Sequence, residues 1–177
     1  GEAGNCGGNR SNATAVEPGS GSTIMAYSGL CAPQNVQSLS DPYFHYVSIK
    51  EMWANLTIGN STCGAISNIN NTAPVIESIQ NYTVPISTPF ALSVIATDVN
   101  GDGLTYTWEQ LDSESTTYPL VSTATGGPAF RSFEPVGNPV RTFPSMETVL
   151  LGNTENEWEV LPSVSRTMRF GVTVRDD

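Results

Sequence analysis

Apolar residues recur at every second position along three segments in the second half of the chain. Period-two alternation with one apolar face is the pattern of a strand that buries one side. The polar stretch 98–103 lies between the first two segments and predicts a hairpin that joins them. The three segments are 90–97, 104–108 and 168–175.

Several short strands over roughly a hundred residues favour a sandwich of two sheets. We therefore expect a mainly β fold, in which the second half is an immunoglobulin-like β-sandwich with Trp108 in its core. The alternation fades between 118 and 162. Within that stretch, Ser145–Leu151 predicts one short helix with Ser145 as its N-cap.

The first half of the chain has a different pattern. Apolar residues at approximately helical spacing predict a helix that starts at Ser40-Asp41-Pro42, with the proline near its first turn, and continues through Trp53. The stretch 68–74 is polar, contains a proline and predicts a linker. The chain therefore divides into two predicted domains, 1–70 and 73–177.

Acidic residues outnumber basic residues by 17 to 7, which gives a formal net charge of −10. Such a surface repels nucleic-acid phosphates and anionic lipids, so neither nucleic acid nor a membrane is an expected partner. No apolar run approaches the roughly 20 residues that a membrane-spanning helix needs. A composition low in lysine and rich in Asp, Asn, Ser and Thr is common among secreted bacterial proteins, so we expect an extracellular location.

Oxygen-bearing side chains alternate in the turn between the first two predicted strands. Asp98, Asn100 and Asp102 form a D-x-N-x-D-G string, which resembles the start of a calcium loop. A complete EF-hand loop needs a glutamate at its twelfth position, and that residue, Glu109, falls where the pattern already predicts a strand. A simple turn is the preferred interpretation, and a bound calcium is the alternative.

A glycine-flanked stretch in the first half, 19–29, reads GSGSTIMAYSG. Taken alone, it predicts a tight turn with a buried methionine, Met25. In context it resembles the Met-turn of metzincin zinc metalloproteases, especially the reprolysin-like enzymes of bacteria. The stretches 40–48, 127–133 and 166–176 resemble the last catalytic helix and the following domain of secreted proteases in this group, so the resemblance covers nearly the whole chain.

The resemblance implies a secreted endopeptidase that hydrolyses extracellular proteins with a zinc-activated water. Metzincins hold the zinc with an HExxHxxGxxH helix that lies before the Met-turn. This sequence contains no such helix, and its one histidine, His45, follows the turn. We therefore expect a truncated α/β catalytic subdomain, with the Met-turn and one helix, ahead of the sandwich. The chain alone should neither bind catalytic zinc nor cleave peptides, and its expected partners are protein or peptide substrates and the upstream part of the catalytic domain.

The resemblance also implies roles for individual residues. Met25 matches the methionine that forms an apolar floor beneath the zinc ligands. Tyr27 matches a tyrosine that astacin-like and serralysin-like metzincins place near the metal, as a zinc ligand or as a stabiliser of the oxyanion. Reprolysins usually lack this tyrosine, so a packing role for Tyr27 is an equal alternative. His45 is expected to make a structural hydrogen bond.

An odd number of cysteines leaves at least one of Cys6, Cys31 and Cys63 unpaired, or paired outside this chain. Cys6 and Cys31 flank the Met-turn, and a disulfide between them is one expectation. Reprolysins have a cysteine after the last helix that pairs with an upstream one, which implies a Cys63 without its partner. A Cys31–Cys63 pair and three reduced cysteines stay open, because spacing does not decide connectivity.

A second class of function also fits the sequence. A non-catalytic extracellular module, which binds or adheres through the sandwich, needs no zinc-binding histidines. The Met-turn and the odd cysteine count favour the protease. The missing histidines favour the binding module only if no catalytic segment lies upstream, so the two interpretations differ in what precedes Gly1.

Overall fold

The computed structural model describes residues 3–176, which contain more strand than helix. We call residues 3–57 the turn half and residues 75–176 the strand half. Residues 1, 2 and 177, at the outer ends of the two predicted domains, lie outside the described residues. The elements in chain order are η1 (Gly4–Cys6), α1 (Tyr46–Thr57), β1 (Val75–Ile76), β2 (Phe90–Ser93), β3 (Ala96–Thr97), β4 (Leu104–Gln110), β5 (Val140–Phe143), α2 (Met146–Leu150), β6 (Glu155–Asn156), β7 (Glu159–Val160) and β8 (Phe170–Asp176).

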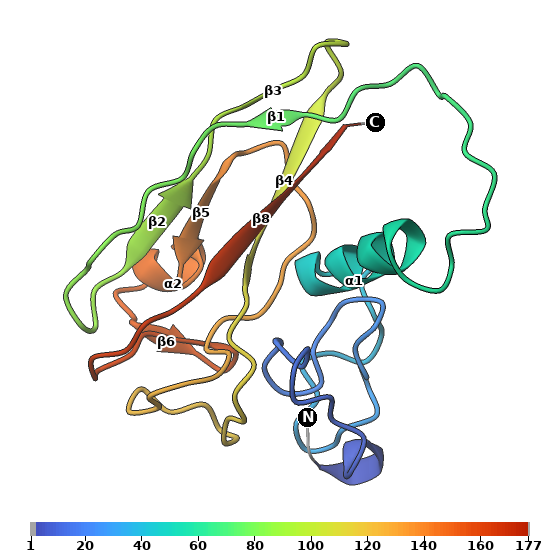
Figure 1. Cartoon of the computed structure of the whole chain (residues 1–177). Coiled ribbons are helices and arrows are strands. Elements are labelled where there is room, and N and C mark those ends of the chain that lie inside the picture. Colours follow the sequence, from blue (N-terminus) through green and yellow to red (C-terminus); the bar gives the residue numbers. More distant parts are fainter. Residues whose placement is uncertain (1–2, 177) are drawn as a thin grey trace.

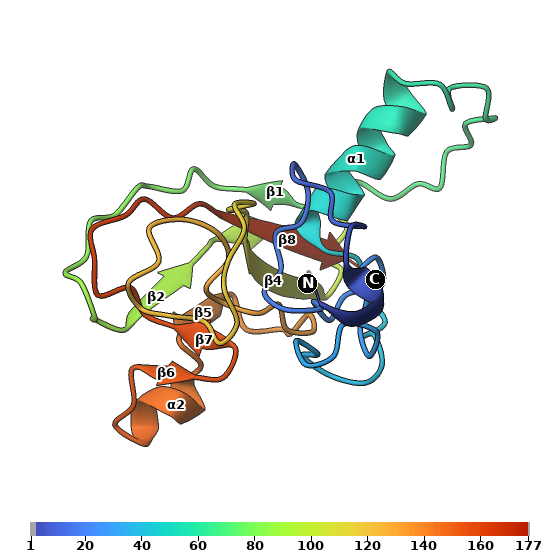
Figure 2. The same ribbon diagram turned by 90° about the horizontal axis from the view of Figure 1, so that it is seen from below.

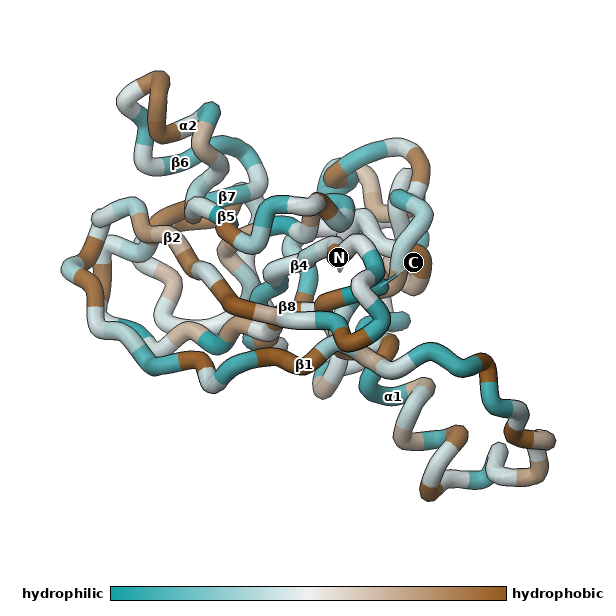
Figure 3. Tube along the Cα trace, turned by 90° about the horizontal axis from the view of Figure 1, so that it is seen from above, coloured by the Kyte–Doolittle hydropathy of each residue, from teal (hydrophilic) through white to brown (hydrophobic). Residues whose placement is uncertain are grey.

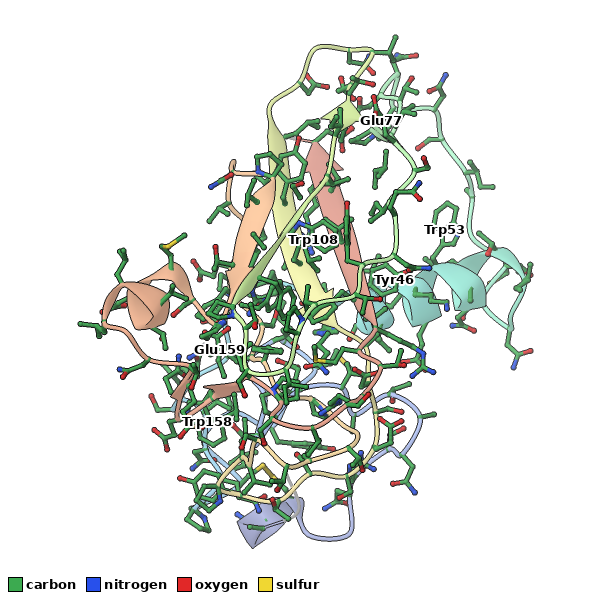
Figure 4. The ribbon with its side chains drawn as sticks, turned by 90° about the vertical axis from the view of Figure 1, so that its left-hand side faces the viewer. Tyr46, Trp53, Glu77, Trp108, Trp158 and Glu159 are labelled. Atoms are coloured by element: carbon green, nitrogen blue, oxygen red, sulfur yellow. A yellow bond between two sulfur atoms is a disulfide. The ribbon has the colours of Figure 1, made fainter. Side chains whose placement is uncertain are left out.

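Two antiparallel sheets carry the apolar core of the strand half (Figure 1). In the first sheet β4 pairs with β8, with Trp108 opposite Val172, and in the second β2 pairs with β5, with Phe90 opposite Phe143. Trp108 is buried, as predicted, and Figure 4 shows it among these strands. The core cluster consists of Val94, Tyr106, Trp108, Ala129, Phe130, Phe143, Leu161 and Val172.

Four phenylalanine rings fill this core. The Phe143 ring stacks on that of Phe90 with centroids 5.1 Å apart. It also lies 5.2 Å from the Phe130 ring and 4.7 Å from the Phe170 ring. Aromatic side chains bury a large apolar area each, so this cluster is the main source of hydrophobic stabilisation in the strand half.

The predicted hairpin around 98–103 is wrong. The segment 90–97 is divided into β2 and β3, and β3 pairs with β1 rather than with the strand that follows it. The partner of β4 is β8, at the end of the described chain. This pairing places Val172 and Val174 opposite Trp108 and Tyr106, so apolar side chains meet across the ladder. Alternation identified the strands, but it does not specify which strands pair.

The described strands form four sheets of two strands each, and no closed sandwich or barrel is present among them. Residues 77–88, which lead from β1 towards β2, are exposed and outside any strand. Residues 111–139, which connect β4 to β5, are irregular apart from isolated bridges. The connections therefore supply none of the additional strands that a complete sandwich needs.

Helix α1 begins at Tyr46, so the predicted start at Ser40-Asp41-Pro42 is wrong. The residues before the helix are bonded to another segment of the turn half. The Asp41 N–H donates to the Ser22 carbonyl, and the Tyr43 carbonyl accepts from the Ile24 N–H. These two bonds hold the backbone away from the first helical turn, so a tertiary contact overrides the local helix signal.

His45 is the N-cap of α1. Its Nδ1 accepts from the Val47 N–H at 3.2 Å, which satisfies one of the free donors of the first turn. This is a structural hydrogen bond, the kind expected for this histidine. Figure 4 shows Tyr46 at the base of α1 beside the strands, and Figure 2 shows the rest of the helix extending away from them.

Helix α2 occupies the position predicted for the short helix, with Ser145 as the N-cap residue. The Ser145 hydroxyl lies 3.0 Å from Thr148 Oγ1 and does not bond to a backbone N–H of the first turn. The β6–β7 pair follows, and Glu159 of β7 is fully buried against Arg141 of β5 at 3.0 Å. Figure 2 shows α2 with the β6–β7 pair projecting from the rest of the strand half. The Arg141–Glu159 ion pair attaches this projection to the core.

Apolar residues also lie outside the core. Figure 3 shows apolar positions along β1 and on α1, where Trp53 is 68% exposed and Leu56 is 58% exposed. Among residues 3–176, no helix has both the length and the apolar character needed to cross a membrane.

Candidate functional site

The resemblance to a Met-turn centres on residues 23–27, which we call the Met25 turn. The Ala26 N–H donates to the Thr23 carbonyl at 3.0 Å and closes a tight turn. The Tyr27 N–H donates to the Ser20 carbonyl, and the Ile24 N–H donates to the Tyr43 carbonyl, both at 3.0 Å. The turn is therefore bonded on both sides to neighbouring segments of the turn half.

The half-buried Glu17 carboxylate supports the Met25 turn. Glu17 accepts from the Ser22 and Thr23 N–H groups at 2.8 and 3.2 Å, and from the Thr23 hydroxyl at 2.7 Å. Burial raises the pKa of Glu17, although these three donors favour its charged form. Gly21 has a φ of +68°, and a Cβ there would lie 2.9 Å from Glu17 Cδ. Glycine at this position therefore allows the carboxylate to sit beneath the turn.

The Met25 turn has an unusual pattern of burial. Thr23, the first residue of the turn, and Ser22, immediately before it, are each 1% exposed. The apolar residues that follow are exposed, with Met25 at 65% and Tyr27 at 47%. Polar side chains are more often outside and apolar ones inside. The turn is thus fixed by hydrogen bonds and presents its apolar side chains on the surface.

Met25 is not buried, so the expectation of a buried methionine in this turn is wrong. Ile24 and Leu30 are also exposed, at 41% and 52%, so Met25 and Tyr27 belong to a group of exposed apolar residues around the turn. A packing role for Tyr27 inside this chain has little support, because nearly half of the residue is exposed. Met25 and Tyr27 are therefore surface residues of the described chain.

A disulfide closes the turn half. Cys6 and Cys31 are bonded, with their Cα atoms 5.2 Å apart, and both are buried. A Cys31–Cys63 pair is therefore not formed, and the three cysteines are not all reduced. Cys63 is free and exposed after α1. Stable disulfides are typical of oxidising compartments.

Comparison with known proteins gave no match. No family model, no curated protein and no solved structure is significantly similar to this chain. The assignment of function therefore depends on the residues and their geometry.

The described residues do not supply a catalytic zinc site. His45 is the sole histidine of the sequence, and its Nδ1 already accepts from the Val47 N–H. Cys6 and Cys31 form a disulfide, so neither has a thiolate that could bind zinc, and Cys63 is exposed in a different segment. Any zinc beside the Met25 turn would need ligands from residues outside this chain.

A buried polar cluster connects the two halves, and little in the sequence pattern indicates it. Glu109 of β4 is fully buried and accepts from the Tyr46 N–H at 2.6 Å and from the Ser132 hydroxyl at 2.5 Å. The Tyr43 hydroxyl donates to Ser132 Oγ at 2.7 Å, and His45 Nε2 lies 3.6 Å from Glu109. We call these five residues the Glu109 cluster.

The Glu109 cluster is not arranged as a nucleophile with a general base. Its serine, Ser132, is 2% exposed and directs its proton to Glu109. Burial lowers the pKa of His45 to about 3, and the charge on Arg141 acts in the same direction. Burial raises the pKa of Glu109 to about 7, against the opposing effect of its hydrogen bonds. The cluster is inaccessible to a substrate, and its bonds join structural segments.

The structure brings three carboxylates together at the far end of the strand half. One oxygen each of Asp98, Asp102 and Asp176 lies within 4.8 Å of the others. The β4–β8 register explains this, because Asp176 is opposite Leu104, just beyond the turn that carries the other two (Figure 1). Asp98 Oδ2 is buried without a hydrogen-bond partner among residues 3–176, whereas its Oδ1 accepts from the Asp102 N–H at 3.1 Å.

Asn100, the third residue of the predicted calcium string, makes different contacts. Its Oδ1 accepts from the Thr72 N–H at 3.0 Å, and its amide donates to the Asn70 carbonyl at 3.4 Å. The Asn100 side chain therefore ties the turn to the segment before β1. Asp176, which is distant in sequence, accompanies Asp98 and Asp102 instead.

Proposed function

We propose that this chain is a fragment of a secreted zinc endopeptidase of the metzincin group. In this proposal it holds the C-terminal part of the catalytic domain, with a reprolysin-like Met-turn, and the domain that follows. The observation that supports the proposal is the burial pattern of the Met25 turn. A turn fixed by the half-buried Glu17 carboxylate, with Met25 and Tyr27 exposed, has the properties needed to form one wall of an active site. The Cys6–Cys31 disulfide is consistent with an extracellular location.

In the proposed whole enzyme, the zinc ligands belong to an HExxHxxGxxH helix upstream of this chain, and this chain contributes the surface beneath them. In that enzyme Met25 would provide the apolar floor, and the Tyr27 hydroxyl would stabilise the oxyanion or ligate the metal. Protein and peptide substrates and the upstream catalytic segment are the proposed partners. The net charge of −10 argues against nucleic acid and anionic membranes.

We also propose that the strand half corresponds to the immunoglobulin-like domain that follows the catalytic domain in such proteases. Two sheets whose residues share one aromatic core, which includes Trp108 of β4, support this assignment. The described sheets are smaller than those of a complete sandwich, so the proposal concerns a reduced form of the fold.

Reading the coding sequence upstream of Gly1 tests the proposal most directly. An HExxHxxGxxH stretch within a few tens of codons supports the protease. The longer protein should then contain zinc and cleave a protein substrate, and a chelator should stop cleavage. An upstream region without these histidines contradicts the proposal and leaves the alternative, a non-catalytic extracellular binding or adhesion module.

The role of Tyr27 can be separated from its position in the fold. In the longer protein, Tyr27→Phe should lower kcat by about 100-fold with little change in KM, because one donor to the developing oxyanion is lost. Tyr118→Phe is the matched control, because Tyr118 donates to Glu157 at an exposed site of the strand half. Equal activity of the two variants would assign Tyr27 to packing against the upstream segment.

A second candidate function is calcium binding at Asp98, Asp102 and Asp176. Three carboxylate oxygens in close proximity match the hard oxygen ligands that calcium prefers. The buried Asp98 Oδ2, which has no hydrogen-bond partner, is the specific observation that favours this site. A cation there would also relieve the mutual repulsion of the three charges.

Calcium binding is tested by thermal unfolding of the chain. Millimolar calcium should raise the unfolding temperature by several degrees, because a ligand that binds only the folded state stabilises it. Asp98→Asn should abolish the shift, whereas Glu147→Gln, in the first turn of α2, should leave it unchanged. A similar shift with sodium chloride at equal ionic strength would indicate charge screening and contradict a specific site.

A further inference from the structure

We propose that the strand half acts as an intramolecular scaffold that fixes the Met25 turn, through a hydrogen-bonded connection from β4 to the turn by way of Tyr43. This assigns a task to the second half of the chain. It depends on the proposed function only for the use of the turn, and its geometry is independent of zinc and of any upstream segment.

The connection begins on a rigid part of the strand half. Glu109 lies in the seven-residue ladder of β4 and β8, opposite Gly171. A Cβ at Gly171 would lie 3.1 Å from Tyr46 Cδ2, so the glycine leaves room for the Tyr46 ring beside the ladder. The Tyr46 N–H thereby reaches Glu109, and Ser132 bonds to the other oxygen of the same carboxylate.

Tyr43 joins this rigid part to the Met25 turn. Its side-chain hydroxyl donates to Oγ of Ser132, a residue of the strand half, at 2.7 Å. Its carbonyl, in the turn half, accepts from the Ile24 N–H at 3.0 Å. Tyr43 is 6% exposed, so both bonds are shielded from water. A displacement of the Tyr43 ring would therefore move the backbone segment to which the turn is bonded.

Two arginines of the strand half hold the same segment of the turn half. Arg131 donates to Gln37 Oε1 at 2.6 Å and lies 3.9 Å from Asp41. Arg175 donates to the Phe44 carbonyl at 3.1 Å. The segment 37–46 is thus attached to the strand half along its length, on both sides of Tyr43.

The turn half has little apolar core of its own. Its buried apolar residues are Val16, Pro18, Tyr43 and the two disulfide cysteines, and none of them belongs to the core cluster of the strand half. A region with so little apolar burial cannot offset the conformational entropy of ordering its many irregular residues. The bonds to the strand half supply part of the missing stabilisation.

Amide hydrogen exchange of the full chain tests the scaffold. Tyr43→Phe removes one hydroxyl and keeps the ring, so the Ile24 amide should exchange about fivefold faster, the effect of losing one net hydrogen bond. Ser132→Ala should give a larger acceleration at the same amide, because it leaves both the Tyr43 hydroxyl and one Glu109 oxygen without their partner. The reference is the Leu151 amide, which donates to Glu147 in α2.

Tyr118→Phe is the matched control, since it also removes one tyrosine hydroxyl from the strand half, at an exposed bond to Glu157. Faster exchange of the Ile24 amide alone, in both cluster variants and not in the control, supports the scaffold. Unchanged exchange at Ile24, or equal acceleration at Ile24 and Leu151, overturns it. The readout requires no metal and no activity, so its failure is distinguishable from failure of the proposed protease function.

Discussion

The two halves of this protein are held in different ways. The strand half has an aromatic core in which Phe143 is fully buried and contacts three other phenylalanine rings. The Met25 turn is held by hydroxyl groups and a half-buried carboxylate, and exposes its methionine and tyrosine. Apolar packing tolerates substitutions that conserve volume, whereas hydrogen bonds depend on individual donors and acceptors. The strand half should therefore be most sensitive to the loss of apolar volume, and the turn to the loss of single polar groups.

The largest expected effect is the loss of a central ring from the strand half. Phe143→Ala should lower the free energy of unfolding by about 3–5 kcal/mol, because it removes the ring and leaves a cavity among its neighbours. Urea denaturation provides the measurement. Phe133→Ala, at a residue that is 37% exposed, is the control and should cost much less. A loss below about 1 kcal/mol for Phe143→Ala would show that the aromatic cluster does not dominate the stability of this half.

The Cys6–Cys31 disulfide should matter most to the turn half. It links residues 25 positions apart, and its loss should cost about 3 kcal/mol on the loop-entropy estimate. The double variant Cys6→Ser with Cys31→Ser should therefore unfold at lower urea concentration, with the turn half affected first. Cys63→Ser, at the free and exposed cysteine, should behave as the parent chain. Unfolding of both halves at the same urea concentration would indicate that they unfold as one unit.

Glu109, which lies where the two halves meet, should make the free energy of unfolding depend on pH. Burial raises the pKa of Glu109 from 4.5 to about 7, so folding favours the neutral carboxyl. The stability that folding gains from the protonated Glu109 carboxyl is fully present below pH 4.5 and is lost as the pH rises through 7. Compared with Glu109→Gln, the parent chain should lose on the order of 3 kcal/mol of stability over this window.

The other charged groups near the cluster act in both proteins and largely cancel in this difference. His45 has the opposite sign, because burial lowers its pKa to about 3 and its contribution is lost as the pH falls from 6.5. Glu17 raises and Arg175 lowers the pKa of Glu109 through their charges. Urea denaturation of both proteins at several pH values is the measurement. A stability advantage of the parent chain that grows with pH would show that the fold prefers the ionised carboxylate.

In the strand half, the sequence predicted the positions of the main strands better than it predicted which strands pair. Alternation located β2, β4 and β8, and Trp108 was correctly assigned to the core, because burial of one face is a local property of the pattern. The hairpin around 98–103 was wrong because pairing depends on residues far apart in the sequence, such as Trp108 and Val172, which are 64 positions apart. The short α2 helix was predicted correctly, since its start is determined by adjacent residues.

The candidate site shows the same limit. The sequence indicated a turn at Met25, but not its outward-facing side chains, because exposure depends on which segments pack beside it. Asp176 joins Asp98 and Asp102 only through the pairing of β8 with β4. The Glu109 cluster could not be predicted, because none of its five residues belongs to a local sequence pattern that indicates a buried polar contact. A glutamate within an otherwise apolar and threonine-rich strand, at 104–110, was the one available signal.

The smallest expected effect distinguishes a surface methionine from a core methionine. Met25 is 65% exposed, so Met25→Ala should change the free energy of unfolding by less than about 0.5 kcal/mol. Met168, which packs against the aromatic core, is the matched control, and Met168→Ala should cost about 2 kcal/mol or more. Urea denaturation of the two variants measures both effects. A loss at Met25 comparable to that at Met168 would mean that the side chain folds back onto the turn half. A negligible loss leaves Met25 free to pack against an upstream catalytic segment, so its contribution should be measurable only once that segment is present.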